Sequence, residues 1–519
     1  MTHKKRKMKI AVISWLAVLI LSIVLFFIAR GFIVFPKQYT WHLAGALAAL
    51  ALLTGVLSFL IKKGKSAVMT VINVILSLCM AAGSIYLPIL QKQMVDVFEK
   101  QDNTEEIVIN AYVMNEEYIT AHPELYTTSE ISYADGIFLT EAGLDPEETQ
   151  EALQQLAVKM ERPSLNVVEK ETIDDALAAL YANEGQVLLI DETQIDMIEE
   201  MEGYEAFSSQ TKILDSVTQV IEVEPEPVKE EDTRPLSERP FQIFLGGADT
   251  RANKLSSRGR KDVDIILTVN PLTKQIMLTT IPRDFYVRDK ALGNRFDKLT
   301  HTGNHGMGNM LNALNNLFET DLRHWMVVNF RTFKNIIDAL GGVDVDNPYA
   351  FHSTADTGGN MNSQNYSFKK GKIHLSGDQA LAYVRERHNL KNGDFGRNEH
   401  QMIVIKAVIN KLTSSAILSK AGSVLNSLQK QFLTDLSSED IWSLINAQIN
   451  TGGSWSFITY HLSGRPTSAV TASANAPRSV VYPYKQQIFF VREQMQKMLN
   501  GENVTQETMP SDNKEYYLP

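Results

Sequence analysis

Cysteine is nearly absent from this chain of 519 residues. Its single cysteine, Cys79, allows neither an internal disulfide nor a cysteine-based zinc site. A basic excess is missing too, because 50 Lys and Arg stand against 60 Asp and Glu, a formal net charge of −10. Nucleic-acid surfaces concentrate Lys and Arg, so we expect no nucleic acid as a partner.

Several common catalytic motifs are also missing. The sequence holds no Gly-x-Ser-x-Gly elbow, no His-Glu-x-x-His pair and no Walker loop. Serine hydrolases, zincins and P-loop NTPases therefore have no motif support. One histidine, His301, lies near charged residues, but a lone histidine is more often packed or at the surface than catalytic.

Long uncharged stretches open the sequence, at residues 10–29, 41–61 and 66–90. Each has about the 20 apolar residues that cross a hydrocarbon core of ~30 Å. Buried helices of a soluble domain are a poor alternative for three such runs in the first ninety residues. We expect three transmembrane helices.

The lysines and arginines beside these stretches predict their orientation. They lie mainly before the first stretch and in the loop between the second and third: Lys4, Lys5, Arg6, Lys7, Lys9, Lys62, Lys63 and Lys65. Because positive loops stay in the cytoplasm, the N-terminus is predicted to be cytoplasmic and everything after Leu90 to lie outside the cell membrane.

The remaining chain is predicted to hold two folded units joined by a linker. Strand-like runs and one helical pattern favour a smaller α/β accessory domain, and a Glu- and Pro-rich stretch after it favours an extended linker. The expected division is a cytoplasmic basic tail at 1–9, three transmembrane helices at 10–90, the accessory domain at 105–223, the linker at 224–239, the main domain at 240–499, and a polar, frayed tail at 500–519.

The main domain alternates strands and helices. Strand-like runs lie at 241–245, 263–269, 275–281 and 325–330, and the middle two are joined by a turn that suits an antiparallel hairpin. Helices are expected at 332–340, ended by Gly341 and Gly342, and after Arg397. The predicted fold class is α/β, with a mixed central sheet flanked by helices.

Charged residues gather where these predicted strands meet loops. Examples are Asp249 and Arg251, Arg260 and Asp262, Arg283 and Asp284, Arg385 and Arg387, and Asp394, Arg397 and Gln401. Arg260 and Asp262, like Arg385 and Arg387, are spaced i and i+2 and can share a face. Guanidinium forks with a few carboxylates suit a pyrophosphate held with a divalent metal. Ordinary surface salt bridges are the alternative, and the pattern alone leaves both open.

The order of the motifs resembles one known family. In sequence they are Gly247-Ala-Asp-Thr-Arg251, Gly259-Arg-Lys-Asp262, Ile281-Pro-Arg-Asp284, Asp297-Lys-Leu-Thr-His301, Ile337-Asp-Ala-Leu-Gly-Gly-Val343, Leu375 to Arg387 and Asp394-Phe-Gly-Arg-Asn-Glu-His-Gln401. This ordered set is similar to the LytR–CpsA–Psr family of Gram-positive bacteria. The three spans and the extra domain resemble its capsule-type CpsA members.

The resemblance implies a phosphotransferase. It would move a glycan, capsular polysaccharide or wall teichoic acid, from a polyprenyl pyrophosphate carrier onto peptidoglycan as a phosphodiester. Mg²⁺ or Mn²⁺ is the implied cofactor. The implied partners are the lipid-linked glycan, the peptidoglycan acceptor, the membrane and capsule-assembly proteins.

The resemblance also implies roles for particular residues. Asp249 and Asp262 match the metal ligands; Asp249, Asp262, Arg260 and Arg283 are expected to act in catalysis; and Arg260, Arg283, Lys298, Arg385, Arg387, Arg397 and Gln401 match the pyrophosphate-binding group. Asp394 is expected to orient Arg397, and Asp249 is the suggested base. Lys261 replaces the family's usual small hydroxyl residue, and we expect it to point outward with little effect. The apolar faces of 307–318 and 403–412 are candidate walls for the lipid tail, with ordinary core as the alternative.

Other functions stay open at this point. A membrane regulator of capsule expression would need a cytoplasmic module, and the nine-residue tail and short loop are too small to fold one. A scaffold that binds lipid-linked glycan, or a pyrophosphatase, would share the same residues. An activity assay separates these possibilities.

Overall fold

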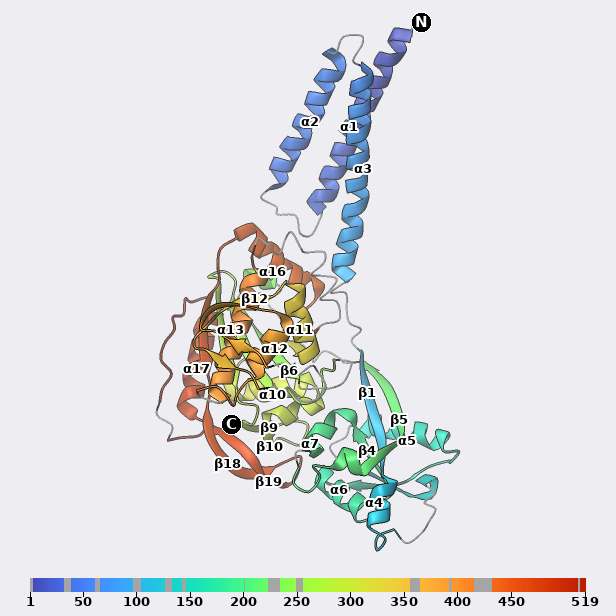
Figure 1. The fold of residues 1–519 in the computed structure, drawn as a ribbon, viewed down its shortest axis with the longest axis vertical. Coiled ribbons are helices and arrows are strands. Elements are labelled where there is room, and N and C mark those ends of the chain that lie inside the picture. Colours follow the sequence, from blue (N-terminus) through green and yellow to red (C-terminus); the bar gives the residue numbers. More distant parts are fainter. Residues whose placement is uncertain are drawn as a thin grey trace.

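The computed structural model describes most of the chain (Figure 1). The described residues are 3–31, 39–60, 66–96, 104–126, 133–141, 146–199, 201–222, 234–248, 255–354, 365–391, 394–414, 432–511 and 514–519. They form three long helices and two α/β units, which we call the first unit (104–222) and the second unit (234–519).

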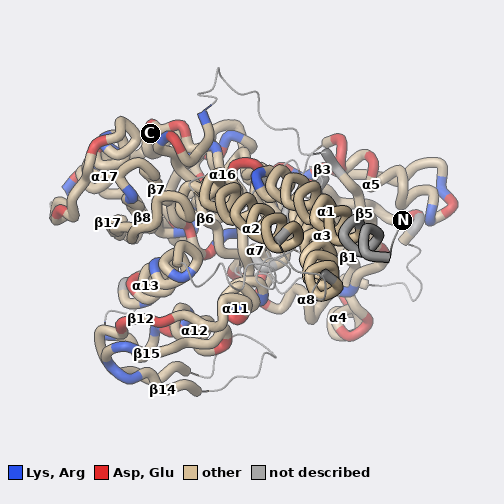
Figure 2. The backbone as a smooth tube through the Cα atoms, turned by 90° about the horizontal axis from the view of Figure 1, so that it is seen from above, with Lys and Arg blue, Asp and Glu red and all other residues tan. Residues whose placement is uncertain are grey.

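The three long helices are α1 (His3–Gly31), α2 (Thr40–Leu60) and α3 (Ser66–Asp96). Each contains a segment long and apolar enough to cross a membrane, Ile10–Gly31, Thr40–Phe59 and Ala67–Lys92, which confirms the expected three spans. They lie side by side in both views of the molecule (Figures 1 and 2). The protein is therefore membrane-anchored.

Polar side chains tie these helices together. Asn73 on α3 is fully buried, and its amide donates hydrogen bonds to the hydroxyls of Ser58 on α2 (3.1 Å) and Ser14 on α1 (3.3 Å). The indole of Trp15 donates to the carbonyl of Ala51 at 2.8 Å. Small and polar residues of this kind hold membrane helices in contact, because lipid itself supplies no hydrogen-bond partner.

The first unit is a five-stranded sheet in the order β3-β2-β4-β1-β5, with apolar clusters on both faces. The central strand β4 is buried along its whole length, as its run of apolar residues predicts. The elements are β1 (Thr104–Met114), α4 (Glu116–Ala121), β2 (Ile137–Glu141), α5 (Pro146–Lys159), β3 (Asn166–Lys170), α6 (Ile173–Tyr181), β4 (Val187–Asp191), α7 (Ile195–Glu199), α8 (Phe207–Gln210) and β5 (Thr211–Glu222).

The second unit is built on a six-stranded mixed sheet in the order β16-β11-β6-β7-β8-β17. Strands β7 and β8 form the predicted antiparallel hairpin, while β11 and β17 run parallel to β6 and β8. The predicted mixed sheet flanked by helices is confirmed. Its strands are β6 (Phe241–Ala248), β7 (Val263–Asn270), β8 (Gln275–Ile281), β11 (His324–Asn329), β16 (Leu433–Thr434) and β17 (Ser456–His461).

The remaining elements surround this sheet. They are β9 (Tyr286–Asp289), β10 (Arg295–Lys298), α9 (Leu299–Thr302), α10 (Met307–Phe318), α11 (Phe330–Ala339), β12 (Val343–Asn347), β13 (Phe351–His352), β14 (Ser367–Phe368), β15 (Gly371–Leu375), α12 (Gly377–Arg385), α13 (Asp394–Leu412), α16 (Ser438–Thr451), β18 (Gly464–Thr471), β19 (Ala476–Pro483) and α17 (Lys485–Leu499). As predicted, Gly341 and Gly342 follow α11 with φ of 73° and 80°.

The sheet has two differently covered faces. On the closed face, α10 and α17 pack on side chains such as Phe244, Ile266 and Met277, all fully buried. On the open face, α13 and α16 pack on a cluster in which Leu245, Val263 and Leu267 stay half-buried. A third apolar cluster joins α11, α12 and α13 to the small strands β12 to β15, which project beside them in Figure 2.

The C-terminal residues are not frayed, contrary to the prediction. Val504 is buried in the closed-face core, and Met509 and Tyr517 pack against it. The side chain of Gln275 exchanges two hydrogen bonds with the backbone of Val504, and Tyr517 donates its backbone N–H to Pro483. The few apolar residues in this polar segment are enough to anchor it.

Candidate phosphate-binding site

The predicted charged residues lie at one edge of the six-stranded sheet. Strand pairing places Gly247 opposite Val263, Asp264 opposite Ile281 and Ala248 opposite Asn329. The ends of β6, β8 and β11 and the start of β7 therefore meet at this edge. Because β7 is antiparallel to β6 and β8, the loop that precedes β7 lies next to the loops that follow β6 and β8.

A chain of ion pairs runs along this edge. Arg283 donates from Nη1 to Oδ1 of Asp262 at 2.6 Å, and Arg260 Nη2 lies 3.9 Å from the same oxygen. Beyond Arg283, Asp284 lies 3.8 Å from its Nε and 3.3 Å from Nζ of Lys298. The structure thus brings together four of the predicted residues, Arg260, Asp262, Arg283 and Lys298, through Asp284.

The side chains of this chain remain partly accessible. Arg283 and Asp262 keep 34% and 24% of their side-chain surface exposed, so solvent or a ligand can reach both. Arginine forks with adjacent lysine suit phosphate oxygens, because each guanidinium can donate two parallel hydrogen bonds. The cluster can therefore hold an anion that displaces the internal carboxylate contacts.

Arg385 reaches the same edge by a different contact. It is the last residue of α12, and its guanidinium lies 4.0 Å from the ring centroid of Phe330, which directly follows β11. Arg387 lies beyond the helix and is exposed, with Nε donating to the ring of His388. The strand-like alternation assumed for these arginines is wrong, because Arg385 is helical and Arg387 is not. Sequence reasoning also missed Phe330.

Arg397 and Gln401 lie one turn apart on α13, as their spacing predicts, and both are half-buried. Between them, His400 stacks on Tyr383 of α12 with ring centroids 4.2 Å apart, and its Nδ1–H donates to the Tyr383 carbonyl, 3.1 Å away. Burial lowers the pKa of His400 and favours its neutral form. This stack fixes α13 against the helix that ends at Arg385.

Three predicted residues lie wholly or partly outside the described residues. Asp249 and Arg251 belong to a segment that the structure does not describe. Asp394 begins α13, but its side chain is not described. Their expected roles stay predictions.

Lys261 does not point outward, and this expectation is wrong. The side chain is fully buried, and Nζ donates to the carbonyls of Ser257, Arg258 and Gly259 at 3.0, 3.1 and 2.7 Å. A buried ammonium is stable only when its donors are satisfied, and three carbonyls satisfy them. Lys261 therefore holds the loop before Arg260 in shape, a role that the i, i+2 pattern did not reveal.

The first unit contacts the same loop through an ion pair. Arg258 makes a two-pronged ion pair with Glu148 on α5, with N–O distances of 3.0 and 2.8 Å, and Asp191 lies 3.9 Å away. The Arg258 and Glu148 side chains are only 17% and 12% exposed, so solvent screens this pair little. The first unit therefore makes at least this one charged contact with the second unit.

Asp264 lies two residues after Asp262, within β7. It is a further carboxyl group that the sequence analysis did not identify. It is 2% exposed, and burial together with the nearby Asp262 carboxylate raises its pKa well above the ordinary value. Its position in the alternation of β7 marks it as inward-facing, which was the available signal. Asp264 is therefore favoured in its neutral form, whereas Asp262 and Asp284 take part in the ion pairs of this edge.

The candidate lipid walls differ from each other. The apolar face of α10 is ordinary core, because Met310, Leu314 and Phe318 are fully buried against the closed face. On α13, Ile405 and Ile409 pack on the open face and stay half-buried. Only the α13 face keeps apolar surface available for a ligand.

His301 is packed, as the general expectation for a lone histidine suggests. It is 7% exposed, and Nδ1 lies 2.7 Å from Oδ1 of the buried Asp297. Burial alone would raise the pKa of Asp297, but the interaction with His301 and the hydrogen bonds from His301 and Ser473 lower it.

The fit of a divalent metal depends on few ligands. Among the described residues no group of three or more His, Cys, Asp or Glu could hold a metal ion. Asp262 supplies one accessible carboxylate, and Mg²⁺ in phosphate sites uses one or two carboxylates plus phosphate oxygens and water. The described edge therefore fits an ion that arrives with a phosphate ligand and does not fit a protein-only cage.

Comparison with known proteins identifies the family of this chain. Residues 199–473, more than half of the chain, match the model of the LytR_cpsA_psr family. A protein of Halalkalibacterium halodurans named polyisoprenyl-teichoic acid–peptidoglycan teichoic acid transferase TagU is 36% identical over 209 residues, 40% of this chain and 64% of that protein. A protein of the same name from Bacillus mycoides is 34% identical over 243 residues, 47% of this chain and 75% of that protein.

This chain belongs to the LytR–CpsA–Psr family. The crystal structure of TagV from B. subtilis is also similar, with a TM-score of 0.42 and 26% identity over 51% of this chain and 98% of that one. The match spans just under two thirds of the length of the H. halodurans relative.

Proposed function

We propose that this protein transfers a phosphorylated glycan from a polyprenyl pyrophosphate carrier onto peptidoglycan. The single observation that carries the proposal is the connected Arg260–Asp262–Arg283–Asp284–Lys298 edge. Membership of the family and the names of the relatives support the choice of donor and acceptor.

The pyrophosphate is assigned to the arginine edge. Arg260, Arg283 and Lys298 donate to its oxygens from one side, and Arg385, Arg387, Arg397 and Gln401 are proposed to complete the binding group. Because guanidinium never loses its charge, it neutralises the pyrophosphate in substrate and transition state alike.

The lipid tail is assigned to the open face. Val263, next to Asp262 in the chain, begins a row of half-buried apolar side chains with Leu245 and Leu267, and α13 adds Ile405 and Ile409. Apolar surface left half-covered beside a charged site suits a ligand with a charged head and an apolar tail.

In the proposed reaction a hydroxyl of the peptidoglycan acceptor attacks the phosphorus that bears the glycan. A new P–O bond forms, the bond to the bridging oxygen breaks, and polyprenyl phosphate leaves. The hydroxyl proton passes to a base, for which Asp249 remains the prediction. Arg283 and Lys298 stabilise charge on the phosphoryl oxygens as the bond breaks.

Mg²⁺ or Mn²⁺ is part of the proposal. Asp262 and Asp249 would hold the ion together with phosphate oxygens. When bound, it would neutralise charge on the leaving phosphate. Asp262 would exchange its contact with Arg283 for this ion, which frees the guanidinium for the substrate. We expect Mg²⁺ to bind weakly alone and tightly with a prenyl pyrophosphate.

The proposed location is the outer side of the cell membrane, with the N-terminus in the cytoplasm. The positive residues before the first span and after the second support it. Protease added to intact cells should then remove both units, and their full protection would contradict both the location and a wall-directed function.

A transfer assay tests the activity. The full chain in detergent or vesicles is supplied with peptidoglycan and a polyprenyl pyrophosphate that carries either a teichoic acid unit or a capsular unit. We expect polymer-linked peptidoglycan and free polyprenyl phosphate with wild type, and neither with Asp262→Ala. Binding of the donor without transfer would instead favour a scaffold. Release of polyprenyl phosphate without labelling of peptidoglycan would favour a pyrophosphatase. The better of the two donors decides between teichoic acid and capsule.

A further inference from the structure

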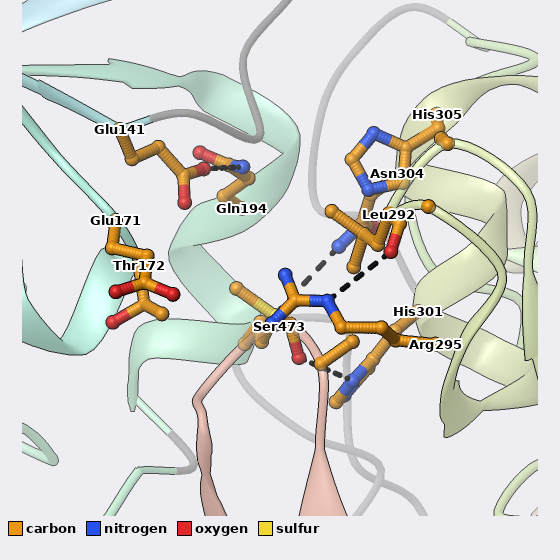
Figure 3. A pocket seen from close by; sticks show the side chains of 14 residues that line it. Glu141, Glu171, Thr172, Gln194, Leu292, Arg295, His301, Asn304, His305 and Ser473 are labelled. Atoms are coloured by element: carbon orange, nitrogen blue, oxygen red, sulfur yellow. Dashed lines mark hydrogen bonds between the residues drawn. The ribbon is translucent and has the colours of Figure 1, made fainter.

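A cavity lies between the two units and is lined by side chains of both (Figure 3). Its volume is about 320 Å³, within the range of small-molecule sites. The first unit lines it with Glu141, Glu171 and Gln194, and the second unit with Arg295, His305 and Ser473. None of these residues belongs to the site proposed for the pyrophosphate.

The wall from the first unit is acidic. Glu141 is 7% exposed, and within the described part of the chain its carboxylate is held only by the side-chain amide of Gln194 at 2.6 Å. Burial, helped by the Asp191 carboxylate, raises the pKa of Glu141 to about 7. Beside it lies Glu171, exposed and without an ion pair to any described residue. A cation reaching this wall would therefore find two carboxyl groups that no described basic side chain neutralises.

The opposite wall carries a positive charge. Arg295 extends into the cavity in Figure 3, and its Nε donates to the carbonyl of Leu292 at 3.2 Å. Across the described residues no carboxylate lies within ion-pair distance of its guanidinium, although Glu171 lines the same cavity. Burial lowers the pKa of His305 and favours its uncharged form, so Arg295 is the permanent cation of this wall.

Three other uses of the cavity fit poorly. No group of three metal-binding side chains occurs among the described residues, so a metal ion lacks ligands. Ser473, His301 and Asp297 resemble a hydrolase triad, but the serine hydroxyl and the carboxylate both contact Nδ1 of the histidine, and a triad needs both ring nitrogens. A sugar would lack the Phe, Tyr or Trp face on which sugars commonly stack, because none of the described residues that line the cavity is one of these.

From these observations we infer that the cavity binds a small zwitterion, an amino acid or short peptide with free termini. Its ammonium group lies against Glu141 and Glu171, and its carboxylate pairs with Arg295. The side chains of Met197, Leu292 and Ala472, which also line the cavity, contact the apolar part of the ligand. Such a ligand supplies both missing counter-charges at once.

The position of the cavity connects it to the arginine edge. The segment that begins at Lys298 separates the two: His301 and His305 line the cavity, while the backbone N–H of Thr300 donates to the carbonyl of Arg283 at 2.9 Å. Gly303 packs against Gly259 so closely that a Cβ at Gly303 would lie 2.6 Å from its carbonyl oxygen. A ligand in the cavity thus touches the far side of the segment that carries Lys298.

Calorimetric titration of the detergent-solubilised full chain at neutral pH tests the inference. The probe is the dipeptide alanyl-alanine, and two controls of the same length each lack one charge: N-acetyl-alanyl-alanine and alanyl-alanine amide. We expect the dipeptide to bind about tenfold or more tightly than either control, because each charge-assisted contact contributes on that scale. Absence of binding, or equal affinity for all three peptides, would overturn the inference.

Three cavity variants locate the binding. Glu141→Gln should weaken binding of the dipeptide about tenfold and abolish its advantage over the N-acetylated control. Arg295→Gln should also weaken binding about tenfold and abolish the advantage over the amide control. Glu171→Gln changes an exposed group that cannot affect folding, and we expect a smaller loss of affinity. Glu202→Gln, an exposed carboxylate of the first unit outside the cavity, is the matched control and should change nothing. Unchanged affinity in all three cavity variants would place the peptide elsewhere and contradict the inference.

Discussion

The two faces of the six-stranded sheet carry similarly apolar side chains but differ in how fully these are covered. The closed face places Phe244, Ile266 and Met277 under α10 and α17 with no exposure. The open face also buries Ile265 and Leu278 fully, yet α13 and α16 leave Leu245, Val263 and Leu267, which are just as apolar, half-covered. Incomplete cover forgoes part of the burial energy, roughly 25 cal/mol per Å² of apolar surface. These half-covered side chains next to the charged edge are the ones that we propose to contact the lipid tail.

The largest expected effect is on activity at the charged edge. Arg283→Ala should reduce kcat/KM roughly 30- to 5,000-fold. This is a loss of roughly 2–5 kcal/mol in transition-state stabilisation, the scale for removing one partner of a desolvated charged pair. Arg283→Lys should be almost as harmful, since an ammonium cannot replace the fork. The melting temperature should stay nearly unchanged. A large loss of stability with intact kcat/KM would make this edge a structural ion-pair network.

The comparison of the faces is tested directly by one pair of truncations. Leu314→Ala removes a fully buried side chain of α10 and should lower the free energy of unfolding by roughly 2–5 kcal/mol. Ile409→Ala on the open face should cost under about 1.5 kcal/mol but weaken prenyl pyrophosphate binding by about fivefold. Denaturant unfolding and lipid titration give both quantities. Equal stability losses and unchanged lipid affinity would show that the open face is ordinary core.

A smaller effect is expected where the first unit grips the loop before β7. Glu148→Gln removes the charge that Arg258 binds and should lower kcat/KM by the equivalent of roughly 1.5–3 kcal/mol, the range for hydrogen bonds to charged groups. The loss should appear in KM when the loop positions substrate. Asp135→Asn, which breaks the exposed Arg162 pair inside the first unit, is the control and should leave kinetics unchanged. Identical kinetics in both variants would separate the first unit from the edge.

The smallest effect concerns pH on the open face. His461 lies beside α13 with Nδ1 2.9 Å from the hydroxyl of Thr280, and burial together with Lys406 lowers its pKa. The unfolded chain therefore binds the proton more readily, so stability present above pH 6.5 should be lost as the pH falls below it. His461→Gln should flatten that part of the stability curve measured by thermal unfolding. An unchanged slope would assign the acid sensitivity to other groups such as His400.

Much of this protein follows from its sequence. Three apolar runs define the spans, and the Asn-Pro turn defines the β7–β8 hairpin, because each signal is local. Arg260 and Asp262 could likewise be paired, since two residues in an extended segment point the same way. The polar C-terminal residues were misjudged because composition does not show what a few apolar side chains can reach.

Local pattern determined which elements form and which end of each strand carries charge. Tertiary structure alone decided the partners. Strand order placed Arg283 beside Asp262. Lys261, which the sequence predicted to point outward, is buried and stabilises the loop through hydrogen bonds to its carbonyls. The packing of the two units joined Glu148 to Arg258 and enclosed the cavity around Glu141. Sequence spacing encodes the direction of a side chain within one element, whereas burial and partnership depend on elements that meet only after the chain has folded.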